Sequence, residues 1–288
     1  MVCTRDRASQ LARTLETYGL IRFSQAWELI VVINASTDAT PEIVDRFRSA
    51  SLLKVIVVNQ PVPGLCAARN LGWRSSHGEI VAFVDDDCYP AADFLSQLQA
   101  CFDKPNLGFA GGKMLLFDDA DLSFLSIQTK ENRIDLPPRS VINAGLIHGG
   151  NMAFRRAVLK EIEGFDEWLG AGTPVKSGGD VDALSRASIA GYAGAYDPRV
   201  VVHHHHGRKT AEEGASVMAG YDVGRGAFLT KCLLDHRRRS LYALPVIRRI
   251  AGHLVKRRFG ILRSELQGSF IYLQCIFREK RARKLTNV

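Results

Sequence analysis

Three consecutive carboxylates at the end of an apolar run are the clearest chemical feature of this chain. Residues Ile80 to Val84 are apolar, and Asp85, Asp86 and Asp87 follow them directly. A short run of this kind is typical of a buried strand, and open α/β sheets bind ligands at the carboxyl ends of their strands. Asp85 and Asp87 share a face of an extended chain. Because carboxylate oxygens suit Mg²⁺ or Mn²⁺, we predict a metal site at Asp85 and Asp87, with Asp87 the main ligand.

The same residues also fit a plainer interpretation, an acidic turn that caps a following helix. Ala91-Ala92-Asp93 is typical of a helix start, and short acidic motifs occur often by chance. The preceding segment favours a metal site, because residues 64–72 are G-L-C-A-A-R-N-L-G and Gly78-Glu79 precede the strand. Residues 64–90 resemble the signature of family 2 glycosyltransferases with the GT-A fold. In that family the carboxylates hold a divalent metal on the diphosphate of a sugar nucleotide.

Shorter segments resemble the same family in the same order. They are the first strand and loop at 2–7, the second strand at 28–40, G-G-N-M-A-F-R-R at 149–156, G-G-D-V-D at 178–182, and a strand ending in histidines at 196–206. The resemblance covers roughly residues 1–230. It implies nucleotide-sugar contacts at Cys3, Thr4, Arg5, Arg7, Asn34, Asp38, Arg69, Asp85 and Asp86, and acceptor contacts at Asn151 and Asp182. Asp86 is expected to touch the ribose or to face solvent.

The resemblance also places the catalytic base at Asp180. Without it, Asp180 has a plainer interpretation as the cap of the following helix, because it succeeds Ser177-Gly178-Gly179. One departure stands beside it, since the family usually has Glu where this chain has Gly179. The predicted base is therefore retained, and a neighbouring carboxylate that would bind the acceptor or tune the base is absent.

A run of four histidines, His203–His206, follows the β-branched residues Val200–Val202. Alternation along a strand places His204 and His206 on one face. The family's own histidines align with these two positions, so we predict His204 as a further metal ligand. The alternative is a solvated polar strand end. Arg208 and Lys209, just beyond the run, are candidates for phosphate contacts, and the alternative is that both are solvated.

Two features of the N-terminal part depart from the family. The family usually ends its second strand with an Asp that accepts a hydrogen bond from the nucleotide, and Ile33 at this position cannot accept one. Base recognition is therefore altered, or another group such as Asp38 substitutes. The chain also begins inside the expected first strand, which is either short or truncated, and truncation would leave the nucleotide loop less well anchored.

Strand patterns alternate with helical patterns along most of the chain. Helices are predicted at 11–18, 41–49, 64–75, 91–102, 157–162 and 181–190, and strands at 27–33, 53–58, 80–84, 107–110 and 194–202. Repeated βα units imply an α/β fold with a mostly parallel, doubly wound sheet, as the Rossmann-like GT-A resemblance also implies. Residues 118–142 have little periodicity and contain Pro137-Pro138, so they are predicted to form a long surface loop.

The composition is that of a globular domain with an extension. The chain has 288 residues, 46% of them hydrophobic, which is enough to bury a large core. Its six cysteines are scattered and form no C-x-x-C pair, so neither a structural zinc site nor a disulfide framework is expected. Free thiols fit a reducing cytosol. We find no signal peptide and no long uncharged apolar stretch, so no bilayer-spanning helix is predicted.

Positive charge is concentrated at the C-terminal end. Residues 231–288 hold 15 Lys and Arg against 3 Asp and Glu, a net charge of +12 in a chain whose total is +8. Apolar residues recur every three to four positions over Tyr242–Gly260, and a second apolar stretch follows at 261–277. This pattern favours a GT-A domain at 1–230 and a basic amphipathic helical extension at 231–288 that contacts a membrane surface. The alternative is helices packed on the catalytic domain with a solvated basic face. No nucleic-acid partner is expected, because no binding module is apparent.

These features predict an inverting, metal-dependent glycosyltransferase that uses Mn²⁺ or Mg²⁺. It would move a sugar from a nucleotide-sugar donor to a saccharide or lipid-linked acceptor in cell-surface polysaccharide synthesis. The expected location is cytoplasmic, on the inner face of the cell membrane.

Two other functions are weighed against this one. A nucleotidyltransferase would have a Gly-rich phosphate loop with basic residues near the start, which this chain lacks. A non-catalytic relative that binds a nucleotide or glycan and assists a partner enzyme is supported by Ile33, Gly179 and the short first strand. The intact residues Asp85, Asp87 and Asp180 argue against that relative.

Overall fold

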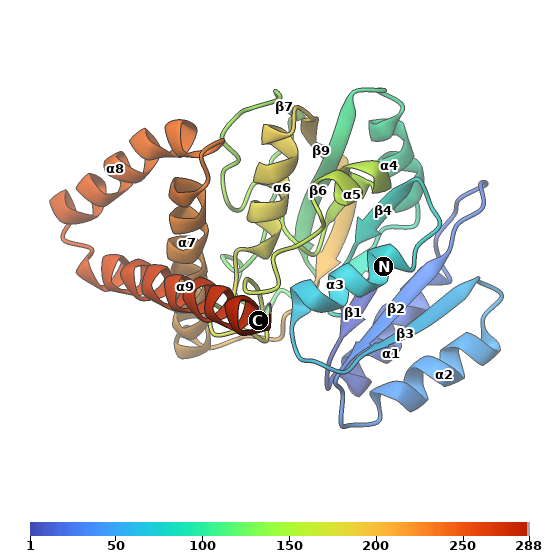
Figure 1. Ribbon diagram of the computed structural model, residues 1–288. Coiled ribbons are helices and arrows are strands. Elements are labelled where there is room, and N and C mark those ends of the chain that lie inside the picture. The colour runs from blue at the N-terminus through green and yellow to red at the C-terminus, as the bar shows by residue number, and fades with distance from the viewer. Residues whose placement is uncertain (287–288) are drawn as a thin grey trace.

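The computed structural model describes residues 1–286, with side chains as far as Arg281. Residues 287–288 of the predicted extension, and the side chains of Arg283 and Lys284 in its basic end, lie outside the described part. Sheets flanked by helices form the body of the molecule, and the last three helices lie to one side of it (Figure 1). The predicted α/β class with a helical C-terminal extension is confirmed.

The elements are, in chain order, β1 (Val2–Thr4), α1 (Ala8–Tyr18), β2 (Leu29–Asn34), α2 (Thr40–Ala50), β3 (Val55–Gln60), α3 (Leu65–Arg74), β4 (Ile80–Phe83), β5 (Cys88–Pro90), α4 (Phe94–Phe102), β6 (Leu107–Leu116), β7 (Ile134–Leu136), β8 (Met152–Arg155), α5 (Arg156–Glu161), α6 (Gly179–Ile189), β9 (Ala193–His204), α7 (Ala211–Leu234), α8 (Arg239–Val255) and α9 (Phe259–Thr286).

The N-terminal sheet is parallel, with strand order β1-β2-β3. Every residue of the central strand β2 is buried. Because side chains alternate along a strand, Val31 packs with residues of α1 and α2, and Val32 packs against Ala68 of α3. Helices on both faces explain why β2 is apolar from Leu29 to Ile33.

The second sheet is mixed, with strand order β4-β8-β6-β9-β5, and β7 also pairs with β9. Repeated βα units predict parallel strands, yet in this sheet only β6 and β9 run parallel. Strand β8 lies between β4 and β6 and is antiparallel to both. Strands β5 and β7 are also antiparallel to β9. The difference arises because β5, β7 and β8 each follow the preceding strand without an intervening helix, and not through a βα unit.

The two sheets meet where the chain begins. The amino group of Met1 donates to the carbonyl oxygen of Ala82 at 2.8 Å, and the N–H of Val84 donates to Met1 O at 3.0 Å. The start of β1 therefore lies along β4. This contact brings the loop after Thr4 and the acidic turn after β4 to the same edge of the molecule.

The segment 118–142, predicted to be a surface loop, is partly buried and contains strand β7. Leu125 and Ile142 are only 1% and 2% exposed, and Leu136 of β7 is 8% exposed. The sequence of this segment has no helix or strand period, but its scattered apolar side chains pack against the core. The segment is therefore fixed to the sheet by its own side chains.

The C-terminal helices form a unit in which α7 packs closely on α9. A Cβ at Gly226 would lie 1.8 Å from Glu265 O, and one at Gly268 would lie 1.8 Å from Val223 O. These two glycines let the helix backbones touch, as small residues do wherever helices cross closely. Helix α7 begins with a capping box formed by Thr210 and Glu213 and continues through the predicted domain boundary at 230/231.

Within residues 1–286, no helix combines the length and apolarity needed to cross a membrane.

Candidate active site

The carboxyl ends of β1 and β4 and the first turn of α6 surround one cavity of about 700 Å³. This volume is in the range of small-molecule sites. The sequence-predicted residues that line it are Cys3, Thr4, Arg5, Arg7, Asn34, Arg69, Asp85, Asp86, Asp87, Asp180, His204 and Arg208. Asp38, Asn151 and Asp182 lie outside its lining. The fold therefore gathers residues from six separate segments of the chain into one site.

Asp85 and Asp86 have different surroundings in the acidic turn. Arg69 Nη2 donates to Asp85 Oδ1 at 3.0 Å and to the carbonyl oxygen of Gly149 at 3.0 Å. Arg69 is 4% exposed, so it is a buried cation held between two acceptors. Burial, together with the charge of Asp87, raises the pKa of Asp86 to about 7. One carboxylate is thus engaged in an ion pair, whereas burial and the charge of Asp87 make ionisation of its neighbour less favourable.

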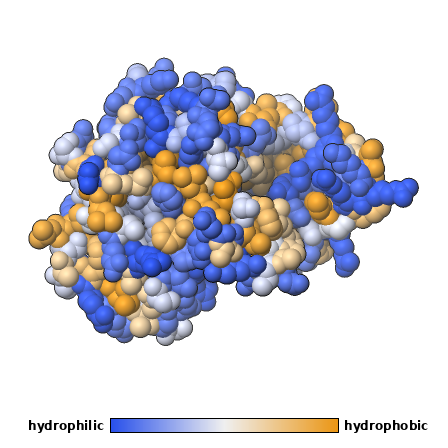
Figure 2. All heavy atoms as spheres, turned by 180° about the vertical axis from the view of Figure 1, so that it is seen from behind, coloured by the Kyte–Doolittle hydropathy of each residue, from blue (hydrophilic) through white to orange (hydrophobic). Residues whose placement is uncertain are grey.

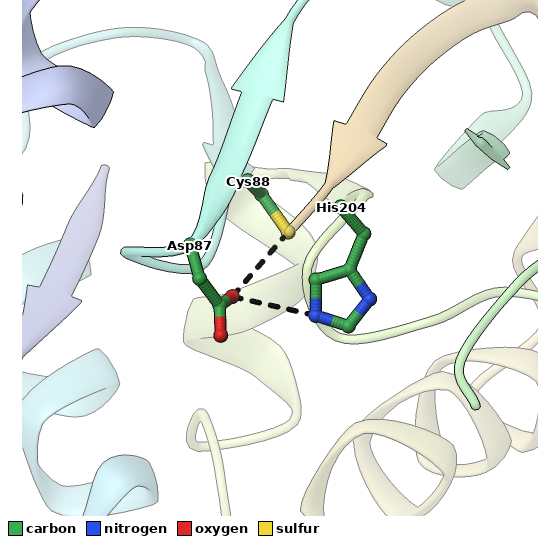
Figure 3. Close-up of side chains that lie close together, drawn as sticks. All are labelled: Asp87, Cys88 and His204. Atoms are coloured by element: carbon green, nitrogen blue, oxygen red, sulfur yellow. Dashed lines mark hydrogen bonds and ion pairs between the residues drawn. The ribbon is translucent and has the colours of Figure 1, made fainter. Parts of the chain in front are cut away.

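Strand pairing brings Asp87 and His204 together (Figure 3). Strand β5 pairs with β9 so that Cys88 lies opposite His204, and His204 Nε2 is 3.4 Å from Asp87 Oδ1. Both side chains belong to residues that are 7% exposed. Burial alone would raise the pKa of Asp87, but the hydrogen bond and charge of His204 outweigh it, and the pKa is lowered.

These residues fit a divalent metal ion. His204 Nδ1 is buried, and no described residue forms a hydrogen bond with it. Asp87, Cys88 and His204 each offer a ligand atom within 4.8 Å of the others. The Cys88 thiol donates to Asp87 Oδ1 at 3.7 Å and is a soft group, whereas Mg²⁺ and Mn²⁺ prefer oxygen and imidazole nitrogen. Asp87 and His204 are therefore the pair suited to such an ion, and Asp85, the other predicted ligand, has its Oδ1 bound to Arg69.

Asp180 is held in a defined orientation at the start of α6. Its Oδ2 accepts a hydrogen bond from the N–H of Gly149 at 3.1 Å, and its Oδ1 accepts one from the N–H of Val181 at 2.8 Å. Gly149 also accepts from Arg69, so one residue connects Asp180 with the acidic turn. A fixed carboxylate in a cavity can accept a proton from a bound hydroxyl.

The residues predicted to contact nucleotide fall into two groups. Thr4 and Arg5 line the cavity, as does Arg7, whose Nη1 lies 3.7 Å from Asp87 Oδ2. Asn34 instead uses its amide on the backbone, donating to Val62 O at 2.7 Å and accepting from Gly64 N–H at 2.9 Å. Asp38 accepts from Ala8 N–H at 3.1 Å and from Thr40 N–H at 3.0 Å. Asn34 and Asp38 therefore position the loops around the cavity.

The two residues predicted on the acceptor side are engaged elsewhere. Asn151 is 1% exposed, and its amide donates to Lys113 O at 2.8 Å and to Val200 O at 3.1 Å. Asp182 is 0% exposed and forms ion pairs with three cations, at 2.8 Å from Arg186 Nε, 2.8 Å from Lys231 Nζ and 2.9 Å from Arg238 Nη1. These contacts join α6 to α7 and to the start of α8.

Sequence reasoning missed one wall of the cavity, which comes from α7. It includes Tyr221, whose hydroxyl lies 2.7 Å from Ser126 Oγ, and Arg225. Lys176 and His148 also line the cavity, and burial lowers the pKa of His148. The only available signal was the position of His148 directly before the G-G-N segment. The glycines of α7 obscure its helical pattern in the sequence.

Solved structures share this fold across most of the chain. The mannosyltransferase of Pyrobaculum calidifontis, solved in complex with GDP-Man and Mn²⁺, superposes with a TM-score of 0.63 at 18% identity. The match covers 94% of this chain and 85% of that one. The structure of Staphylococcus aureus TarS residues 1–349 in complex with UDP-GlcNAc gives a TM-score of 0.61 at 20% identity, and covers 84% of this chain and 68% of that one.

Sequence comparisons point to the same group of proteins. Glycosyltransferase AglE of Haloferax volcanii is 29% identical over 189 residues, covering 63% of this chain and 56% of its own length. The pre-mycofactocin glycosyltransferase of Mycobacterium tuberculosis is 25% identical over 211 residues, covering 72% of this chain and 42% of its own length. The chain thus spans about half the length of these relatives. The sequence model of glycosyl transferase family 2 matches residues 1–163, more than half of the chain, and the chain therefore belongs to that family.

Proposed function

We propose that this chain is an inverting, metal-dependent glycosyltransferase acting on a nucleotide-sugar donor. The observation that supports the proposal most strongly is that Asp87, His204 and Asp180 line one cavity. A leaving diphosphate needs charge neutralisation, and an acceptor hydroxyl needs a base. The cavity offers residues suited to each task.

On the donor side, Asp87 and His204 would hold Mn²⁺ or Mg²⁺. When bound, such an ion neutralises charge on the leaving diphosphate. Arg7, Lys176 and Arg208 line the same cavity and add positive charge from the protein itself. Arg69 lines the cavity as well, and its Nη2, bound to Asp85 and Gly149, holds the acidic turn in place.

On the acceptor side, Asp180 takes the proton from the attacking hydroxyl. Its two hydrogen bonds fix the direction of the carboxylate before substrate binds, which lowers the cost of orientation. The hydroxyl oxygen forms the new bond at the anomeric carbon as the bond to the diphosphate breaks on the opposite face. A single displacement of this kind inverts the anomeric configuration.

The acceptor that we propose is a saccharide or a lipid-linked saccharide of a cell-surface polysaccharide, used at the cytoplasmic face of the membrane. Exposed apolar residues on α8 and α9 lie among basic ones, and hydrophobic and hydrophilic residues intermingle at that end of the molecule (Figure 2). Such a surface suits contact with anionic lipid.

The experiment that tests the function separates donor binding from transfer. UDP, GDP and dTDP are titrated by calorimetry with and without Mn²⁺ into wild type and Asp180→Asn, and the matching nucleotide sugar is then used in a turnover assay with acceptor extracts. Asp180→Asn should bind nucleotide like wild type and lose transfer by at least about 100-fold, the lower range for a general base. The exposed variant Asp45→Asn serves as the control.

Two outcomes would oppose the proposal. Full turnover by Asp180→Asn would remove this residue from the role of base. Nucleotide binding by a folded wild-type chain without turnover of any donor would favour the alternative, a non-catalytic relative that assists a partner enzyme.

A further inference from the structure

A second group of metal-ligating side chains lies beside the candidate active site. Asp118, Asp121 and His205 each offer a ligand atom, and the three atoms lie within 4.8 Å of one another. The group is distinct from the Asp87–His204 pair. Adjacent histidines point to different partners, because His204 meets Asp87 whereas His205 Nε2 lies 3.9 Å from Asp118 Oδ2.

The ring of His205 is already oriented as a ligand. Its Nδ1 lies 3.2 Å from the hydroxyl of Tyr89, and its ring stacks at a tilt on Phe117 with centroids 5.2 Å apart. Metal-bound histidines commonly use their second nitrogen for a hydrogen bond of this kind, which fixes the ring and the tautomer. Nε2 is thereby left to face Asp118.

A tight turn places the two carboxylates together. The N–H of Asp121 donates to Asp118 O at 2.9 Å, and Asp118 Oδ1 accepts from Ala120 N–H at 2.9 Å. The remaining oxygen, Asp118 Oδ2, lies 3.0 Å from Lys209 Nζ. One oxygen of Asp118 is therefore held by the backbone, and the other faces His205 and the ammonium group of Lys209.

Asp121 provides an independent sign that a cation belongs here. Its side chain is 0% exposed, its Oδ2 accepts from Gly207 N–H at 2.9 Å, and its Oδ1 has no hydrogen-bond partner among residues 1–281. Burial of a carboxylate is costly unless positive charge or hydrogen bonds compensate for it. The backbone supplies one hydrogen bond, which leaves one oxygen of the group uncompensated.

His206 does not supply the missing charge. Its Nδ1 lies 3.8 Å from Asp121 Oδ2, but Nδ1 accepts a hydrogen bond from Arg208 N–H at 3.0 Å. Its Nε2 lies 3.1 Å from Leu122 O, to which it can donate. The neutral tautomer with the proton on Nε2 satisfies both contacts, so Nδ1 has no proton to offer Asp121.

We propose that Asp118, Asp121 and His205 bind a second divalent ion, separate from the ion that would serve the nucleotide sugar. A set of two carboxylates and one imidazole suits Zn²⁺ or Mn²⁺. Ligand atoms about 2.0–2.2 Å from one ion lie about 3–3.5 Å apart. The 3.9 Å between His205 Nε2 and Asp118 Oδ2 needs only a small contraction, with Lys209 leaving Asp118 as the ion enters.

The ion would hold the end of β9 against the turn at 118–121. His205 N–H donates to Asp87 O at 2.8 Å, so the backbone of this histidine connects the second site to the acidic turn. An ion bound there would hold Asp87 and His204 in position, because Asp87 accepts that hydrogen bond and His204 is the neighbour of its donor. The role is structural, and no chemistry of the transfer passes through it.

The test counts ions and measures stability rather than turnover. The full chain is stripped with a chelator and titrated with ZnCl₂, and in parallel with MnCl₂, by calorimetry and thermal unfolding. Asp121→Asn and His205→Ala should each bind one ion fewer than wild type. Asp87→Asn should keep the part of the metal-induced rise in unfolding temperature that comes from the second site. Asp121→Asn and His205→Ala should lose that part. His203→Ala, which changes a neighbouring histidine outside the group, should keep the wild-type stoichiometry.

A gain-of-affinity variant keeps the test sharp even if Asp121→Asn fails to fold. Lys209→Met removes the cation that competes for Asp118 and should tighten binding at this site several-fold, with His205→Ala abolishing the gain. The proposal is overturned if His205→Ala binds as many ions as wild type with the same affinity. It is also overturned if Lys209→Met leaves the affinity unchanged.

Discussion

The thiol of Cys66 occupies the space that a side chain at position 179 would need. A Cβ on Gly179 would lie 2.3 Å from Cys66 Sγ, and Cys66 is fully buried in α3. Gly179 is the first residue of α6 and directly precedes Asp180. The Glu expected from the family resemblance is thus excluded by a specific neighbour. The start of the helix that carries the predicted base can therefore approach α3 closely.

This pair predicts a double-mutant cycle. Gly179→Ala should lower the free energy of unfolding by about 1–3 kcal/mol, the range for overpacking a filled site. In the background of Cys66→Ala the same change should cost much less, because Sγ is gone. Urea unfolding of the four chains measures the coupling. Gly252→Ala is the control, because nothing lies within 4 Å of a Cβ at that glycine.

An equal loss of stability in both backgrounds would contradict the steric account of Gly179. Stabilisation by Gly179→Ala, as expected for a helical glycine with free space around it, would contradict it more directly.

Removing the charge of Asp85 should affect nucleotide binding differently from removing the charge of Asp87. Asp87→Asn and His204→Ala should abolish the Mn²⁺ dependence of nucleotide binding, because each removes a predicted ligand. Asp85→Asn should retain that dependence and weaken nucleotide binding by about 10–100-fold, the range for groups that support a metal site. Calorimetric titration of nucleotide at fixed Mn²⁺ distinguishes the two patterns. Loss of Mn²⁺ dependence in Asp85→Asn would instead make Asp85 a ligand, as the sequence pattern predicts.

Asp182 should make stability depend on pH. Burial would raise its pKa, but the charges of Lys231, Arg186 and Arg238 outweigh burial and lower the pKa well below its usual range. A lowered folded-state pKa adds stability that is present above the unfolded-state pKa of about 3.9 and is lost as pH falls below it. Asp182→Asn should therefore destabilise the chain by about 3–5 kcal/mol at pH 7, since it leaves buried cations unpaired.

Urea unfolding of wild type and Asp182→Asn between pH 7 and pH 2 measures this effect. The difference between the two chains should begin to shrink only below about pH 4, where the unfolded chain takes up a proton at Asp182 while the folded carboxylate stays ionised. The exposed variant Asp45→Asn should differ little from wild type throughout. A constant difference across the pH range would show that packing, rather than charge, makes Asp182 important.

Local patterns predicted most of the fold, and long-range pairing accounts for the differences. Each predicted helix and strand between residues 11 and 202 has a counterpart within a few residues, because the apolar periods of these elements are strong. The antiparallel position of β8 between β4 and β6 could not be predicted, since Met152–Arg155 carry no signal of direction. The burial of Leu125 was equally hidden, because it depends on the sheet that the loop covers.

The candidate site was predictable where a motif coincides with a strand end. Asp87 and His204 meet because β5 and β9 pair, and both had been predicted as ligands from the resemblance. The contacts of Asp182 could not be predicted, because two of its three cationic partners, Lys231 and Arg238, lie far along the chain from α6. The wall contributed by α7 was missed for the same reason: its residues become part of the cavity only through tertiary packing.

The exposed face of α8 predicts binding to anionic membranes. Leu244, Ile247 and Leu254 are 52%, 63% and 50% exposed, and they recur at a spacing that places them on one face of the helix. The exposed run Lys256-Arg257-Arg258 follows the helix directly. Partial insertion of the apolar side chains and attraction of the cations would act together.

Sedimentation with vesicles separates these two contributions. Changing Lys256, Arg257 and Arg258 to Ala should weaken binding to phosphatidylserine vesicles by about 3 kcal/mol, or about 100-fold, at about 1 kcal/mol for each basic residue. Leu244→Ser with Ile247→Ser should weaken binding to the same vesicles and leave its salt dependence intact. Leu52→Ser, at a fully exposed leucine between α2 and β3, is the matched control and should bind like wild type. The prediction is wrong if wild type binds phosphatidylcholine and phosphatidylserine vesicles equally, or binds neither. The basic face would then be a solvated surface.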